Sequence, residues 1–141
     1  MKSRETLIRL RRFEVDEKRQ KVVEIESMID DFKQMAADLD RQIKSEEERA
    51  GVSDIKHYAY PTYAKAALAR RDNLTASAQN LVAKLEAARD ELAEAFEELK
   101  KVELLEERDG DRMKARRDSV EQAEYDDIGR MGMMRLAGEH G

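Results

Sequence analysis

The chain has 141 residues, of which 42% are charged and 5% aromatic, and its formal net charge is −5. Ordinary globular proteins have about 25% charged residues, so this composition is typical of long, solvated helices and not of a thick globular core. Cysteine is absent, which excludes a disulfide framework and thiolate chemistry, and the negative charge argues against nucleic acid as the main partner.

The first predicted element is a long helix over about residues 3–50. Apolar residues recur there in alternating steps of three and four, and this 3.5-residue period is typical of a coiled-coil helix that buries a narrow stripe. Gly51 offers a stop at the C-terminal end of the helix. The stripe consists of Ile8, Val15, Val22, Ile25, Ile29, Phe32, Ala36, Leu39 and Ile43.

Residues 51–61 form the clear break in this pattern and are predicted to be a bend. Pro61 suits the first turn of a second helix, expected over about residues 61–128, where the same period returns. Gly110 lies inside this helix and costs about 1 kcal/mol, which weakens the helix without ending it. The glycines that follow residue 128 predict a flexible tail over residues 131–141.

Two such helices joined by a short bend predict an all-α fold. We expect a long antiparallel two-helix coiled coil over residues 1–130, with the second helix longer than the first. Residue i is expected to face roughly residue 113 − i, which brings Ile25 opposite Ala88. Residues 1–23 contain eight Lys/Arg and four Asp/Glu, and they would lie beside residues 86–111, which contain four Lys/Arg and eleven Asp/Glu.

Little in the sequence points to catalysis. His57 lies in the bend and His140 in the tail, so the two histidines are far apart. The acidic runs at 46–48 and 126–127 are consecutive on a helix, where neighbours point about 100° apart and cannot converge on one ion. There is no glycine-rich phosphate loop. We therefore predict no enzyme activity, no cofactor and no metal site.

Three groups of side chains are candidates for partner contact, and each has a plain structural interpretation that stays open. The tyrosines of the bend either plug the open end of the hairpin or dock a partner. The basic residues between Arg9 and Arg19 are either neutralised by the acidic part of the second helix or contact an acidic partner surface. The methionines after residue 130 either form an adaptable binding patch or belong to the tail.

Three stretches of the chain resemble one known family. Residues 7–15 (LIRLRRFEV) resemble its N-terminal helix, and residues 95–108 (AFEELKKVELLEER) resemble its Lys-rich turn followed by Glu-x-Leu-x-Glu-Arg. Residues 121–129 (EQAEYDDIG) resemble its closing Glu-Gln…Asp-Glu pattern. The family is FliJ, the soluble coiled-coil protein of the flagellar type III export apparatus, and the likeness is greatest to its alphaproteobacterial branch.

The resemblance implies a hairpin similar to the central stalk of rotary ATPases. Its terminal end would enter a hexameric export ATPase ring, and its bend would reach the membrane export gate. The arginines implied to contact the ring are Arg4, Arg9, Arg12, Arg19, Arg112, Arg116 and Arg117. The residues implied to contact the gate are Tyr58, Tyr60, Tyr63 and Ala67. Family members tend to place tyrosines at the end of the first helix, whereas this chain has Leu39, Ile43, Glu46 and Ala50 there.

Further partners implied by the resemblance are an ATPase regulator and the export chaperones that the protein would escort. No apolar run approaches the roughly 20 residues that cross a bilayer, and the N-terminus lacks the apolar centre of a secretory signal. We therefore expect a cytoplasmic protein, peripheral at the inner-membrane export apparatus. Two alternatives stay open: a holdase-type coiled-coil chaperone, and a homodimeric structural scaffold in which residues 113–128 pair between chains.

Overall fold

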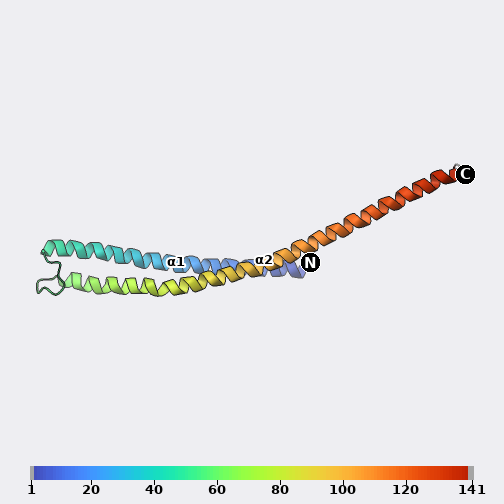
Figure 1. The fold of residues 1–141 in the computed structure, drawn as a ribbon. Coiled ribbons are helices and arrows are strands. Elements are labelled where there is room, and N and C mark those ends of the chain that lie inside the picture. The colour runs from blue at the N-terminus through green and yellow to red at the C-terminus, as the bar shows by residue number, and fades with distance from the viewer. Residues whose placement is uncertain (1, 140–141) are drawn as a thin grey trace.

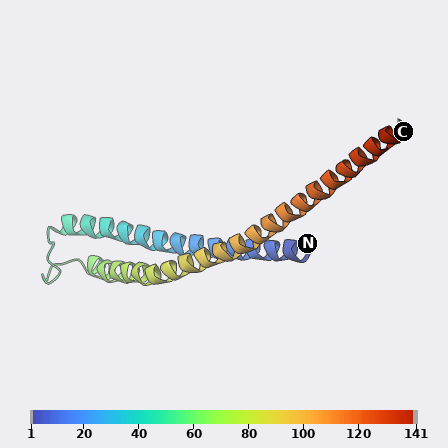
Figure 2. The same cartoon turned by 45° about the vertical axis from the view of Figure 1, so that its right-hand side comes forward.

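A computed structural model of the protein describes residues 2–139. It contains two helices, α1 (Lys2–Ala50) and α2 (Thr62–Glu139), and the described range has no strand. The helices run antiparallel and side by side, and the distal part of α2 projects beyond the hairpin (Figures 1 and 2). The predicted all-α hairpin with a longer second helix is confirmed, since α1 has 49 residues and α2 has 78.

The bend lies between Gly51, which was expected to end the first helix, and Pro61, which was expected to begin the second. Gly51 has a φ of 72° and its N–H donates to the carbonyl of Glu47 at 2.9 Å, which is the left-handed C-terminal cap predicted for α1. The carbonyl of Pro61 accepts from the N–H of Lys65 at 3.1 Å. Pro61 therefore stands just before α2, which begins one residue later than expected.

At its other end α2 continues to Glu139, well beyond the expected end near residue 128. Residues 131–139 are helical and not the flexible tail that the glycines predicted. An isolated glycine costs about 1 kcal/mol but keeps its N–H and carbonyl, so the hydrogen-bond ladder runs on through Gly129, Gly132 and Gly138. The last two residues of the predicted tail, His140 among them, lie outside the described range.

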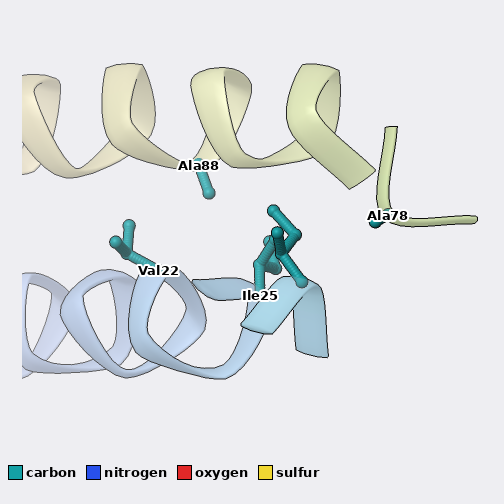
Figure 3. Packing of buried hydrophobic residues seen from close by; sticks show 5 residues of the cluster. Val22, Ile25, Ala78 and Ala88 are labelled. Carbon is teal, nitrogen blue, oxygen red and sulfur yellow. The ribbon is translucent and has the colours of Figure 1, made fainter. Parts of the chain in front are cut away.

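The helices meet along a narrow apolar seam. On α1 the buried residues are mainly branched aliphatics, and on α2 they are mainly alanines, which permits axes about 8–10 Å apart. Ile25 and Ala88 belong to one buried cluster, which agrees with the expected register. In Figure 3, Val22 and Ile25 point from α1 toward α2 while Ala88 points back toward α1. The seam consists of Val15, Val22, Ile25, Ile29, Ala36, Ile43, Tyr60, Ala64, Ala67, Ala78, Ala88, Ala95, Leu99 and Val102.

The apolar seam ends at Val102, and charged contacts close the last turns of the hairpin. From Gly110 to Gly138 every side chain is exposed. At 1.5 Å per residue, this bare part of α2 is about 40 Å long. The expectation that the second helix outruns the first is thus confirmed, and the overhang is longer than expected because α2 ends later.

Candidate functional site

The side chains expected to contact partners lie at the two ends of the hairpin, and the terminal end is the more highly charged. The guanidinium of Arg4 donates to the carboxylate of Asp109, and its Nη1 lies 3.7 Å from Glu106 Oε2. The same Nη1 lies 3.5 Å from the carbonyl of Leu105. The hydrogen bond from the Arg4 guanidinium to Asp109 holds the pKa of this carboxyl group below its ordinary value. Arg4 therefore fastens the start of α1 to α2.

Two further arginines of α1 are also engaged within the chain. Arg12 Nη2 lies 3.7 Å from Glu103 Oε2 across the hairpin. Arg19 lies 3.7 Å from Asp16 and 5.5 Å from the centroid of the Phe96 ring. Arg9 is exposed and forms no ion pair with any residue in the described range. Neutralisation by the acidic part of α2 thus holds for Arg12 and Lys18. Arg11 and Arg19 pair instead with acidic residues of α1 itself.

The three arginines of the bare part of α2 are in a different situation. Arg112, Arg116 and Arg117 are all exposed, and none forms an ion pair with residues 2–138. A shallow groove of about 380 Å³ runs along this face. Its lining combines basic, apolar and acidic side chains: Met113, Arg116, Arg117, Val120, Glu121 and Glu124. Of the seven arginines implied to contact the ring, the four without an ion pair in the described range are therefore Arg9, Arg112, Arg116 and Arg117.

At the bend, two of the expected contact residues are buried. Tyr60 is 9% exposed, and its hydroxyl donates to Glu47 Oε1 at 2.7 Å, which raises the pKa of the tyrosine. Ala67 is 5% exposed and packs in the seam. The implied role of these two residues in direct contact therefore does not fit their burial. Tyr60 instead plugs the open end of the hairpin, which was the structural interpretation of the bend tyrosines.

The other two tyrosines of the bend remain accessible. Tyr58 is 96% exposed, and its ring stacks on that of His57 with centroids 4.6 Å apart. Tyr63 is 56% exposed, and its hydroxyl donates to Gln42 Oε1 at 2.7 Å. Both side chains present aromatic area together with a polar group, as residues that anchor protein interfaces do.

A groove beside Tyr63 was not predicted from the sequence. It has a volume of about 340 Å³ and runs between α1 and α2 near the bend. Leu39 was assigned to the buried stripe, yet it is half-buried and opens into this groove together with the half-buried Leu74 of α2. One signal was available, because Met28 and Met35 stand seven residues apart outside the stripe. The groove is lined by Met35, Asp38, Leu39, Gln42, Tyr63, Arg70 and Leu74.

Sites of two other kinds were sought in the described part of the chain. No group of three or more His, Cys, Asp or Glu side chains is placed there to hold a metal ion. Neither α1 nor α2, over the residues described, has a stretch long and apolar enough to cross a membrane.

Comparison with known proteins identifies the family. The model of the flagellar FliJ protein family matches residues 1–138, almost the whole chain. No curated protein and no solved structure matches the chain. FliJ proteins are structural or chaperone-type components of flagellar export and are not known as enzymes. This chain belongs to the FliJ family and is thus a component of the flagellar export apparatus.

Proposed function

We propose that the protein is the central stalk of the flagellar export ATPase ring, that it couples the ring to the membrane export gate, and that it escorts export chaperones. The observation that carries the proposal is the unequal hairpin. Its terminal end is closed by Arg4, and beside it about 40 Å of α2 is fully exposed. A rigid rod with one bare end suits insertion into the axis of a ring.

Contact with the ring would rest on the arginines that are free to make it. Arg112, Arg116 and Arg117 project from the bare part of α2, and Arg9 adds a fourth exposed cation on α1. Guanidinium groups bind carboxylates through two parallel hydrogen bonds, so acidic loops lining the ring are the chemistry we expect opposite them. Arg4, Arg12 and Arg19 would act indirectly, because their contacts within the chain keep the terminal end closed.

Contact with the gate would rest on the bend. Tyr58 and Tyr63 are exposed there, and the groove beside Tyr63 offers half-buried leucines to an apolar side chain. Tyr60 and Ala67 would support this surface from beneath, since both pack in the seam. The protein would thereby be cytoplasmic and peripheral at the inner membrane, with its bend toward the gate.

Binding to the purified ATPase ring tests the ring assignment. We expect Arg116→Glu combined with Arg117→Glu to weaken binding at least tenfold, because the new carboxylates would face acidic loops. Arg130→Glu is the matched control, since Arg130 is an exposed arginine of the same helix that pairs with Asp127 and lies outside the groove. Equal ring binding by the double variant and the unaltered protein would refute the assignment.

The gate assignment needs its own measurement. Tyr58→Ala with Tyr63→Ala should weaken binding to the soluble part of the gate protein while ring binding is unchanged. Tyr125→Ala serves as control, because Tyr125 is 69% exposed on the bare part of α2, far from the bend. If Tyr125→Ala lost gate binding while the Tyr58/Tyr63 variant kept it, the contact would lie on the bare part of α2 and the gate assignment would be wrong.

A further inference from the structure

The bare part of α2 carries its charges in two separate blocks. Residues 112–117 contain four basic and no acidic residues, and residues 118–127 contain five acidic and no basic residues. Arg116, Arg117, Glu121 and Glu124 line one groove, yet none of them forms an ion pair with the rest of the described chain. This part of α2 therefore has a positive half and a negative half. Asp127 pairs with Arg130 and Asp126 accepts a hydrogen bond from Gln122, whereas the charged residues that line the groove form no ion pair in the described range.

We infer that two copies of the chain pair antiparallel through about residues 109–131, with a two-fold axis near Val120. A rotation about that axis sets residue i opposite roughly residue 240 − i of the second copy. Three of the four basic residues of one copy then lie near an acidic residue of the other. The pairs are Arg116 with Glu124, Arg112 with Asp127 and Arg117 with Glu121, whereas Lys114 and Asp126 point away from the stripe.

The charge order selects this orientation over the parallel one. A parallel pair in register would set four cations against four cations and five carboxylates against five carboxylates. Like charges face to face oppose pairing, whereas opposite charges suppress wrong registers and speed the encounter. Exposed ion pairs contribute only about 0–1 kcal/mol each, so they choose the orientation more than they drive association.

Apolar side chains supply the attraction. Met113, Val120 and Met131 are spaced by seven and eleven residues, close to two and three helical turns, and thus share one stripe. They are 64%, 55% and 69% exposed, so pairing would remove much of their surface from water. In the proposed register Val120 meets its own copy and Met113 lies near Ile128 of the second copy.

The end of the pairing fits the place where α1 and α2 diverge. A hollow of about 370 Å³ lies there, lined in part by Asp109, Gly110 and Met113. The proposed register points Met131 of the second copy toward Asp109 and so toward this hollow. The paired stretch spans about three heptads, the shortest length at which a coiled-coil pattern is reliable, so we expect weak and reversible pairing.

Pairing would cover Arg116 and Arg117, the same side chains that we propose contact the ring. A self-paired copy would therefore be unable to enter the ring. Protein outside the ring would be a dimer that must dissociate before it can bind. This consequence rests on the proposed function, whereas the self-pairing itself does not.

Cysteine crosslinking tests the orientation directly, because the chain contains no cysteine of its own. Val120→Cys should form a disulfide-linked dimer under mild oxidation. Met113→Cys and Ile128→Cys should each remain monomeric alone and crosslink when mixed. Crosslinking of Met113→Cys with itself would mean parallel pairing, and no crosslink in any of the four samples would mean no pairing; either result overturns the inference.

Sedimentation measures the role of the charges. The weight-average mass of the unaltered protein should rise with concentration from 16.3 kDa toward twice that value. Arg116→Glu/Arg117→Glu and Glu121→Arg/Glu124→Arg should each stay monomeric, and their equimolar mixture should again double in mass. Lys33→Glu, on an exposed position of α1, is the control and should dimerise normally. A monomeric mixture would overturn the inference.

The second double variant also separates the two proposals. Glu121→Arg/Glu124→Arg keeps every arginine proposed to contact the ring, so it should still bind the ring while it fails to self-pair. Dimerisation without ring binding by the unaltered protein would overturn the proposed function alone. Ring binding by an unaltered protein that stays monomeric at all concentrations would overturn the self-pairing alone.

Discussion

Lys18 Nζ lies 3.1 Å from Glu91 Oε2, although 73 positions separate the two residues in the chain. Lys21 Nζ approaches the same oxygen at 3.4 Å. Lys18 interrupts the apolar stripe of α1, and its charged end reaches the acidic helix opposite while its stem stays along the seam. A contact of this kind specifies which turn of α1 lies beside which turn of α2.

Exchanging the two charges should reveal this role. Lys18→Glu places a carboxylate beside Glu91, and Glu91→Lys places an ammonium beside Lys18 and Lys21, so each single variant should unfold at a lower temperature. The double variant restores one opposite pair and should recover most of the loss. Thermal unfolding followed by circular dichroism measures all three, and a double variant no better than the worse single would argue against direct pairing.

Acid should loosen the terminal half of the hairpin. Hydrogen bonds from Lys18 and Lys21 lower the pKa of Glu91 from its ordinary 4.5, and the hydrogen bond from Arg4 lowers that of Asp109 from 3.8. A lowered carboxyl pKa stabilises the folded form above the unfolded value, and this contribution is lost as the pH falls through the folded value. The protection of amides near Arg4, measured as their exchange rate relative to the intrinsic rate at the same pH, should therefore fall below about pH 4.

Asp109→Asn provides the control for this pH dependence. An amide cannot ionise, so the variant should exchange faster near Arg4 already at pH 7 and respond less to acid. If the variant and the unaltered protein had the same pH profile, Asp109 would not be the group that titrates.

The apolar seam should carry most of the stability. Ile29 is 8% exposed within the main cluster, and Ile29→Ala should lower the free energy of unfolding by about 2–4 kcal/mol. Met28 is 46% exposed on the neighbouring position, so Met28→Ala should cost less than about 0.5 kcal/mol. Urea denaturation of the two variants compares them, and equal losses would mean that Ile29 is not in the seam.

Two glycines should respond in opposite ways to alanine. Gly51 has a φ of 72°, where a Cβ is strained, so Gly51→Ala should cost about 1 kcal/mol even though no atom lies within 4 Å of the new methyl. Gly110 is helical with equally open surroundings, so Gly110→Ala should stabilise the local helix by about 1 kcal/mol. Urea denaturation suits the first variant, and amide exchange over residues 106–114 suits the second. A stabilised Gly51→Ala would contradict the left-handed cap.

The end of α2 shows where reasoning from residue types was misleading. Glycine-rich composition after residue 128 predicted a tail, but each glycine stands alone between helix-forming residues such as Met131 and Leu136. Isolated glycines lower helix stability without interrupting its hydrogen bonds. At Gly51 the same residue type does end a helix, because its φ of 72° is the left-handed conformation of a C-terminal cap.

The sequence alone determined the two long helices, the bend between them and the register within about one turn. The reason is that a 3.5-residue apolar period depends only on the spacing of residues along the chain. Only the tertiary structure decided which contact residues are available. Ala67 and Tyr60 are buried while Tyr63 is open, and Arg12 is paired while Arg116 is not. Those outcomes depend on how each side chain is turned relative to the opposite helix, and a long guanidinium can reach any of several carboxylates that the linear sequence does not distinguish.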